Sequence, residues 1–509
     1  MVLTIKFFKS SSSLLFKKIY NDLFIRMIIM HLKNGSTLLS FSFVVVIIIS
    51  VTIILLLNPS INVYAQSKKQ SQSIGDITIN DPNLKVELVN DEVIASTSMA
   101  FLGPDDFLVL GKDGTVNRVT NGQMLPEPLL QLNTVNSKDE RGMLGIDVLK
   151  QNSSTSSGGS TTTNPTYVFL YYTEGGVGGG TVDKTADGDG SDDGSSDQTT
   201  TTVIRNHLYR YELVNNKLVN PRLLLDLPGN PGPAHQGGKV AIGPDNNIYI
   251  SIGDERPTAF TEPEGKTKAQ NYADAVDPDG RAGILRVTPD GQVVNGKGII
   301  GDQDPLNKYY GYGIRNSFGI GFDPVTGNLW DTENGPDCCD EINLVQAGFN
   351  SGWAQVLGAW RVADPNTTPP LTRGEQLASP NPQGLVDFGG KGKYSEPEFV
   401  WIGTVGPTAV LFFNSDRLGN QYQNDMFVGS AKGTIFDFDL NKDRTALSLN
   451  GTLSDKIADD NDIDLKDIIF AEGFGTITDI KTGPDGYLYV VTGVREDHGT
   501  IYRIVPASS

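Results

Sequence analysis

Short runs of apolar residues recur along the chain from about Ile79 onward, and clusters of Gly, Pro, Asp and Asn separate one run from the next. The runs are rich in Val, Ile, Tyr and Phe, which favour strands. No long stretch repeats its apolar positions at the spacing of a helix. This pattern predicts an all-β fold for the part of the chain that carries it.

One turn sequence, Gly-Pro-Asp, occurs three times, and an apolar run follows each copy within a few residues. Proline presets the first turn angle and the residue after it accepts the reversal, so each copy predicts a tight hairpin. A motif that recurs at such intervals favours a β-propeller over a sandwich. Six blades suit the length, and five or seven remain alternatives. The turns are Gly103–Asp105, Gly243–Asp245 and Gly483–Asp485, and the runs are Phe107–Leu110, Ile248–Ser251 and Leu488–Val491.

The first 66 residues have a different character. Several Lys and Arg residues precede the apolar run Leu38–Leu57, and Val63–Ala65 places small residues where an export peptidase cleaves. We predict a signal peptide over residues 1–66, or an uncleaved membrane anchor, because the run is long enough to span a bilayer. Translation from Met30 would leave a signal peptide of ordinary length. Either outcome exports the rest of the chain, to the outside of the cell or the outer face of the membrane.

Residues 67–509 are predicted to form a single propeller domain with one insertion. The insertion, at about 175–202, consists almost entirely of Gly, Thr, Ser and Asp. Such a composition cannot bury apolar surface, so we expect a disordered loop there.

The net charge of -19 argues against a nucleic-acid partner, because the phosphate backbone would be repelled over most of the surface. A small neutral or cationic ligand fits this charge better. The two cysteines of the chain, Cys338 and Cys339, are adjacent and cannot join distant segments. We expect them to be thiols rather than a disulfide.

His235, one of four histidines, lies in the small-residue loop Pro233–Gly238, directly before a strand-like run. Such a loop lets an imidazole approach a ligand closely, so His235 is our candidate catalytic base. Asp254 closes the next run, where a carboxylate could orient the imidazole. Arg315 and Asn316 follow a later run, and a cation beside an amide could hold an oxygen on which negative charge accumulates.

The acidic turn Glu333–Asp337, with Asp340 and Glu341 after it, offers carboxylate and carbonyl oxygens that suit calcium. Each of these candidates also has an ordinary alternative. Asp254 could cap a turn, Arg315 could pair with a surface acid, and the acidic turn could simply be solvated.

Four stretches of the chain resemble the soluble quinoprotein glucose dehydrogenases and aldose sugar dehydrogenases, also called the glucose/sorbosone dehydrogenase family. The resemblance covers nearly the whole exported part, apart from the insertion. It is most specific in the last stretch, which contains Arg315-Asn316, Gly335-Pro336 and Asn350–Trp353. The four stretches are Glu140–Ile146, His235–Asp254, Gly283–Gly291 and Gly313–Trp353.

The resemblance implies a six-bladed propeller that holds pyrroloquinoline quinone and calcium over its central channel. His235 would then take the proton from the anomeric hydroxyl of an aldose while a hydride passes to the quinone, with Asp254 behind the imidazole. Arg315 would stabilise the reduced quinone oxygen. The electrons would pass on to an external acceptor.

The resemblance also implies the cofactor and metal ligands. The carbonyls of Gly335 and Pro336 would face the calcium, near Asp340 and Glu341. The residues implied to bind the cofactor are Asn316, Lys432, Trp401 and Thr404.

Two departures from the family pattern concern positive charge. The family has two arginines where this chain has Thr476 and Thr478, and those arginines bind the quinone's carboxylates. Arg141 stands where better-known members have a glutamine, and we expect it to supply part of the missing charge. These departures leave two other functions open: a propeller that binds carbohydrate or protein without redox chemistry, and a calcium-dependent lactone hydrolase.

Overall fold

The structure is a computed structural model that describes residues 76–150, 154–155, 161–162, 165–175, 203–230, 232–256, 265–336, 338–359, 384–459, 461–493 and 499–507. The predicted signal or anchor segment and nearly all of the predicted insertion lie outside these residues. Across the described ranges, no helix is long and apolar enough to cross a bilayer.

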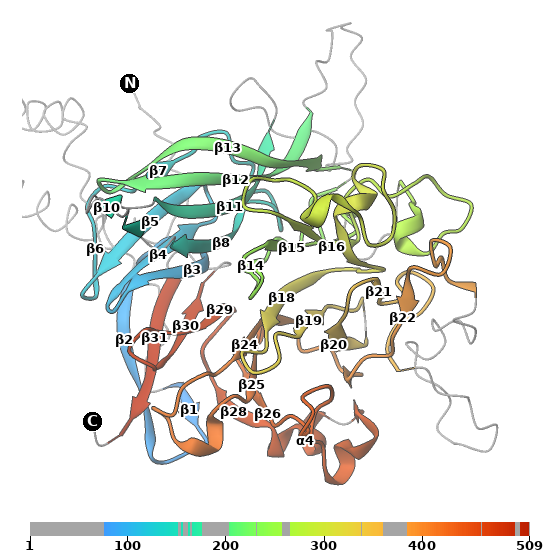
Figure 1. Cartoon of the computed structure of the whole chain (residues 1–509). Helices are drawn as coiled ribbons and strands as arrows, with labels where there is room; N and C mark the ends of the chain where they lie inside the picture. The colour runs from blue at the N-terminus through green and yellow to red at the C-terminus, as the bar shows by residue number, and fades with distance from the viewer. Residues whose placement is uncertain are drawn as a thin grey trace, which may run out of the picture. The chain divides into compact units, whose positions relative to one another are not determined.

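Sheets arranged around a common centre account for most of the described chain (Figure 1). Six of the sheets built from described residues have four or more strands, and a seventh is the two-stranded ribbon of β9 (Ser154–Thr155) and β10 (Thr161–Thr162). The first large sheet contains β3 (Ser96–Gly103), β4 (Asp106–Gly111), β5 (Thr115–Thr120), β6 (Gln123–Met124) and β7 (Leu130–Gln131). The second contains β8 (Met143–Lys150), β11 (Thr166–Gly175), β12 (Ile204–Val214) and β13 (Lys217–Pro228).

The remaining four large sheets follow in chain order, and short edge strands extend three of them. The third contains β14 (Val240–Ile242), β15 (Ile248–Ile252), β16 (Gly283–Val287), β17 (Tyr309–Tyr312), β21 (Phe349–Asn350) and β22 (Lys393–Tyr394). The fourth contains β18 (Ser317–Phe322), β19 (Leu329–Glu333), β20 (Asp340–Val345), β23 (Phe399–Trp401) and β27 (Ile457–Ala458). The fifth contains β24 (Pro407–Phe412), β25 (Met426–Ser430), β26 (Ile435–Phe438), β28 (Ile469–Glu472) and β1 (Thr78–Ile79). The sixth contains β29 (Ile477–Thr482), β30 (Leu488–Thr492), β31 (Gly499–Pro506) and β2 (Leu84–Val93).

Helical structure in the described residues is limited to segments of three to five residues. They are α4 (Asn461–Asp464) and the 3-10 turns Lys268–Gln270, Val294–Gly296, Leu306–Lys308, Asn420–Tyr422, Gly451–Asp455 and Leu465–Asp467.

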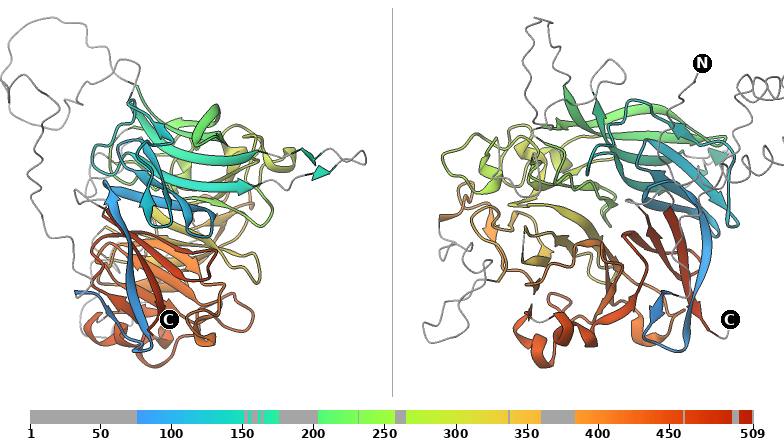
Figure 2. Two further views of the ribbon diagram at one scale, coloured as in Figure 1. Left: turned by 90° about the vertical axis from the view of Figure 1, so that its left-hand side faces the viewer. Right: turned by 180° about the vertical axis from the view of Figure 1, so that it is seen from behind.

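The first strand of each large sheet lies at the centre of the ring. The strands β3, β8, β14, β18, β24 and β29 contact one another in that order, and β29 returns to contact β3. The last sheet closes the ring, because β2 from the start of the described chain pairs with β31 from its end, Leu84 opposite Pro506 (Figure 2). The prediction of an all-β propeller is confirmed.

The Gly-Pro-Asp turns form the hairpins that the sequence predicts. They join β3 to β4, β14 to β15 and β29 to β30, and each pair of strands is antiparallel. In each case the turn connects the innermost strand of a sheet to the second strand. The second strands Ile248–Ile252 and Leu488–Thr492 are buried at every position. Neighbouring sheets cover both of their faces, which explains why these strands read as continuous apolar runs.

Candidate active site

A cavity of about 290 Å³ lies at the end of the channel where the inner strands begin. Each of the six large sheets contributes a residue at or directly before the start of its inner strand, and loops next to the inner and second strands complete the wall. These six residues are Thr97, Leu144, Lys239, Phe318, Thr408 and Thr478. Every sheet of the ring therefore contributes to the wall of this cavity.

His235 lines the cavity and pairs with Asp254. Its Nδ1 lies 2.6 Å from Oδ1 of Asp254, and both side chains are almost completely buried. A carboxylate only accepts, so Nδ1 carries the proton and Nε2 keeps its lone pair. Nε2 is buried and has no hydrogen-bond partner in the described protein. This residue of the cavity wall therefore has an acceptor nitrogen that no described group occupies.

The backbone around His235 explains how the side chain reaches this place. His235 has a φ of 59°, in the left-handed region that residues other than glycine rarely adopt. Its N–H donates to Oε2 of Glu140 at 2.6 Å. A side chain at Gly253 would collide with the carbonyl oxygen of His235, so glycine is required where the two loops cross.

Burial and neighbouring charges set the protonation states of His235 and Asp254. Burial, with a further contribution from the charge of Arg315, lowers the pKa of His235 below its ordinary value, although Asp254 acts in the opposite sense. Burial alone would raise the pKa of Asp254, but His235 and Arg256 outweigh it and hold that pKa below its ordinary value. At neutral pH the imidazole is therefore neutral and the carboxylate is ionised.

Arg315 and Asn316 lie beside the histidine, between β17 and β18. The carbonyl of Arg315 accepts from the N–H of Asp254 at 2.9 Å, and its Nη1 donates to the carbonyl of Asn334 at 2.6 Å. Burial lowers the pKa of Arg315 to about 10, so it remains a cation at neutral pH. Asn316 accepts from the N–H of Gly237 at 3.2 Å. The structure thus brings His235, Asp254, Arg315 and Asn316 together.

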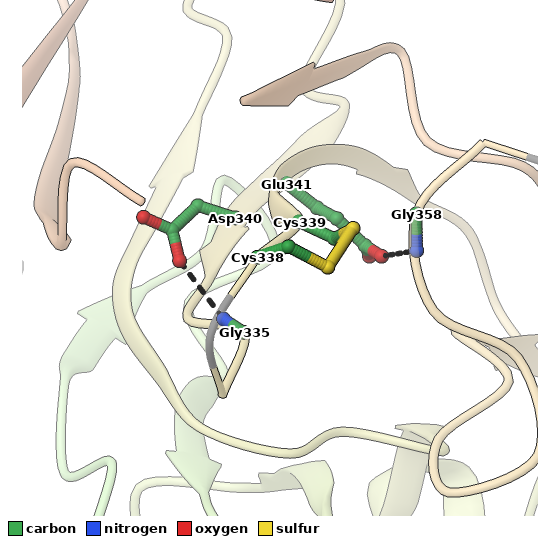
Figure 3. The surroundings of a disulfide bond; sticks show 6 residues. All are labelled: Gly335, Cys338, Cys339, Asp340, Glu341 and Gly358. Carbon is green, nitrogen blue, oxygen red and sulfur yellow. Dashed lines mark hydrogen bonds between the residues drawn. A yellow bond between two sulfur atoms is a disulfide. The ribbon is translucent and has the colours of Figure 1, made fainter. Parts of the chain in front are cut away.

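Gly335 and Pro336 line the cavity, and Asp340 holds their loop in place. Oδ1 of Asp340 accepts from the N–H of Gly335 at 2.9 Å, and Oδ2 accepts from the N–H groups of Val405 and Gly406. Figure 3 shows this carboxylate turned toward Gly335. Both of its oxygens are engaged by the backbone, so Asp340 orients the loop and does not itself line the cavity.

Cys338 and Cys339 form a disulfide within the same loop (Figure 3). The expectation of two thiols is wrong, because the loop between β19 and β20 turns the neighbouring side chains toward each other. The Sγ of Cys339 packs against Gly358, and the N–H of Gly358 donates to Oε1 of Glu341 at 2.5 Å. The disulfide thus lies between the hydrogen bonds of Asp340 and Glu341.

Glu341 belongs to a buried acidic group behind the cavity. It pairs across the β19–β20 hairpin with Glu333, and Asp331 lies on the same face two residues before Glu333. Burial and neighbouring negative charge raise the pKa of Glu333, and they raise those of Asp331 and Glu341 to about 7. In the described part of the chain no three carboxylate, imidazole or thiolate groups are arranged to hold a metal by themselves. A cation here would need carbonyl oxygens as additional ligands.

Three residues implied to bind the cofactor, Trp401, Thr404 and Lys432, do not line the cavity, and neither does Arg141. Arg141 is buried, and it donates to the carbonyl of Gly229 at 2.6 Å. Trp401 lies in an apolar cluster with aromatic residues of β23 and β26. Lys432 is exposed and donates to the carbonyl of Thr404 beside the mouth.

The cavity also contains groups that the sequence interpretation did not assign. Glu140 lies next to Arg141 in the same matched stretch, but Glu140 is the one that faces the cavity. Lys112 and Lys239 supply positive charge there. Lys239 forms a buried ion pair with Asp479, which sequence spacing does not reveal because the partners lie on different sheets.

A model of the glucose/sorbosone dehydrogenase family matches residues 95–503 of this chain. The aldose sugar dehydrogenase YliI of Escherichia coli (strain K12) is 28% identical over 274 residues, which are 53% of this chain and 60% of that protein. The aligned region thus covers less than two thirds of the length of that relative.

Solved structures agree with this chain in fold. The soluble aldose sugar dehydrogenase of Escherichia coli in its apo-form superposes with a TM-score of 0.54 at 22% identity, over 83% of this chain and 99% of the other. The aldose sugar dehydrogenase of Streptomyces coelicolor in its PQQ-bound form gives a TM-score of 0.51 at 19% identity, over 83% and 98%.

Proposed function

Because this chain belongs to the glucose/sorbosone dehydrogenase family, we propose that it oxidises an aldose sugar at the anomeric carbon, with His235 as the general base and pyrroloquinoline quinone as the hydride acceptor. The observation that carries the proposal is the buried His235–Asp254 pair. His235 lines the channel cavity, and its Nε2 has no hydrogen-bond partner in the described protein. An aldose hydroxyl within reach of Nε2 would lose its proton to the imidazole.

The residues of the cavity fit an anionic quinone. Three cationic residues line the cavity, Arg315, Lys239 and Lys112, and they outnumber the two acidic ones, Asp139 and Glu140. Asn316 adds an amide. The Streptomyces coelicolor enzyme of the same fold holds this cofactor. When bound, the quinone supplies the hydride acceptor that no amino acid side chain provides.

Each protein group then has a distinct role in the proposed reaction. His235 accepts the hydroxyl proton at Nε2, and Asp254 stabilises the imidazolium that results. Arg315 stabilises negative charge that develops on an oxygen beside it. Carbonyl oxygens of Gly335 and Pro336 would bind calcium, and Asp340 and the disulfide keep that loop in position. The closed ring of inner strands supports a six-bladed count for the propeller.

We also propose that the protein acts outside the cytoplasm, attached to the membrane or released from it. The basic residues before the apolar run Leu38–Leu57 support export. Cell fractionation with an antibody against the propeller tests this proposal. Recovery of the protein only from the cytosol would contradict it.

The activity is tested with the purified chain supplied with calcium and pyrroloquinoline quinone, by following dye reduction with a panel of aldoses. We expect His235→Asn to lower kcat by at least about 100-fold. His207→Asn is the matched control, because His207 pairs with Glu174 and Asp226 and does not line the cavity.

Other outcomes would replace the proposal. If no aldose reduced the dye and the quinone caused no absorbance change, the chain would not be a quinoprotein dehydrogenase. Sugar binding without dye reduction would indicate a binding propeller. Lactone hydrolysis that needs calcium but no quinone would indicate a hydrolase.

A further inference from the structure

The carboxylate of Asp254 binds three side chains, and only one of them is His235. While Oδ1 accepts from His235, Oδ2 accepts from Nε of Arg256 and from Nε1 of Trp353, each at 2.8 Å. All four side chains are buried. The two additional donors occupy the oxygen that His235 leaves unused, so the carboxylate cannot rotate without breaking two hydrogen bonds.

Arg256 is also tied to the loop that carries the histidine. Its backbone N–H and C=O exchange hydrogen bonds with Ala234, the residue before His235, at 3.1 Å each. Its guanidinium carbon lies 4.7 Å from the centroid of the Trp353 ring. A guanidinium over an aromatic face is stabilising, so Arg256 helps to fix the ring that donates the second hydrogen bond.

Trp353 reaches Asp254 from the loop after β21. Its backbone N–H donates to the carbonyl of Gly313 at 3.0 Å, and its carbonyl accepts from Nδ2 of Asn271 at 2.9 Å. The guanidinium carbon of Arg315 lies 5.5 Å from the same ring. Trp353 therefore contacts both the aspartate that orients the base and the arginine of the cavity.

Arg256 and Trp353 affect the pKa of His235 through the charge distribution on Asp254. His235 interacts with Asp254, Arg315 and Glu140, and Asp254 interacts with His235 and Arg256. Donors on Oδ2 draw negative charge away from the oxygen that faces Nδ1. Without them more negative charge would face the imidazole, which would stabilise its protonated form.

We propose that Arg256 and Trp353 are positioning residues for proton transfer at His235. By holding Oδ2 of Asp254, they keep Oδ1 on Nδ1 and leave Nε2 unprotonated for the cavity. Neither residue lines the cavity. The inference rests on the proposed function only for the identity of the proton donor, a sugar hydroxyl. The tautomer of His235 and its pKa are properties of the resting protein.

The test compares two substitutions in the full chain. Trp353→Phe retains an aromatic ring and removes the N–H donor. Arg256→Met removes the charge and the side-chain hydrogen bond to Oδ2 of Asp254, and it keeps the backbone hydrogen bonds to Ala234. The chain has four histidines, so selective ¹³C and ¹⁵N labelling of histidine gives few NMR signals. Those of His235 are the ones that disappear in His235→Asn. The NMR titration gives the pKa and the tautomer without any assay of activity.

We expect both substitutions to raise the pKa of His235 by about 0.5 to 1, with Arg256→Lys returning part of the shift. The acid limb of the kcat/KM profile should move to higher pH by the same amount. Asp254→Asn should shift the pKa of His235 in the opposite direction, because it removes the negative charge itself.

Two control substitutions separate positioning from general damage to the fold. Trp330→Phe removes a buried indole N–H that has no hydrogen-bond partner in the described protein. Arg444→Met breaks an ion pair with the buried Asp323. Both should leave the His235 titration unchanged.

The proposal is overturned if Trp353→Phe and Arg256→Met leave the pKa and tautomer of His235 as they are in the controls. If the chain oxidised no sugar, the proposed function would be wrong. The NMR titration would still decide the roles of Arg256 and Trp353.

Discussion

Lys239 and Asp479 form an ion pair at the rim of the cavity, although 240 positions separate them in the sequence. Asp479 also accepts from Oγ of Ser98 at 2.6 Å and from the N–H of Met99 at 3.1 Å. The carboxylate therefore connects the sixth sheet, which contains Asp479, to the first and third sheets of the ring. Burial lowers the pKa of Lys239 to about 8, against the opposing charge of Asp479.

Lys239→Met should destabilise the protein by about 3 kcal/mol, because it leaves the buried charge of Asp479 without its closest partner. This loss is at the lower end of the usual range for breaking a buried ion pair, because the charge of Lys481 also stabilises the Asp479 carboxylate. Urea unfolding measures the change. The double variant Lys239→Met with Asp479→Asn should be more stable than Lys239→Met alone. A double variant whose loss equals the sum of the two single losses would show that the pair is not coupled.

The pH dependence of kcat/KM should follow the lowered pKa of His235. Because burial places this pKa below its ordinary value of 6.5, the neutral, base-competent imidazole persists through neutral pH and is lost only below 6.5. We therefore expect a plateau above pH 7 and a fall toward acid with its midpoint below 6.5. A midpoint above 6.5 in the protein without substrate would contradict the burial of the imidazole.

Local sequence patterns predict much of the fold. The Gly-Pro-Asp turns specify hairpins by turn chemistry, and apolar runs such as Ile248–Ser251 specify strands that are covered on both faces. Ring closure is different, because it pairs β2 near the start of the described chain with β31 near its end. No local signal marks Leu84 as the partner of Pro506.

The site is partly predictable for a geometric reason. In each sheet the inner strand begins, and the second strand ends, at the same mouth of the channel, so the loop before β14 and the loop after β15 bring His235 to Asp254. The direction of individual side chains cannot be deduced in this way. Glu140 and Arg141 are neighbours in the chain, yet only Glu140 lines the cavity.

Calcium bound by the carbonyls of Gly335 and Pro336 should stabilise the folded chain partly through the negative charge of Asp331 on the adjoining β19–β20 hairpin. Asp331 is fully buried, and burial and the charge of Glu341 raise its pKa to about 7. Without calcium, Asp331→Asn should raise the free energy of unfolding by about 1 kcal/mol, because it removes a charge that is costly to bury. With calcium the same substitution should remove part of the stabilisation. Thermal unfolding with calcium and with EDTA measures both effects. An equal change in the two buffers would show that the charge of Asp331 does not act on bound calcium.

Thr478 and Thr476 line the cavity where the family resemblance leads us to expect arginines. Thr478→Arg should add a charge-assisted hydrogen bond to a quinone carboxylate, worth about 1.5–3 kcal/mol, and so raise quinone affinity by at least about 10-fold. Titration calorimetry with calcium present measures the affinity. Thr134→Arg adds the same charge at an exposed position outside the cavity and serves as the control. Equal affinity in the two variants would mean that the quinone's carboxylates do not lie beside β29.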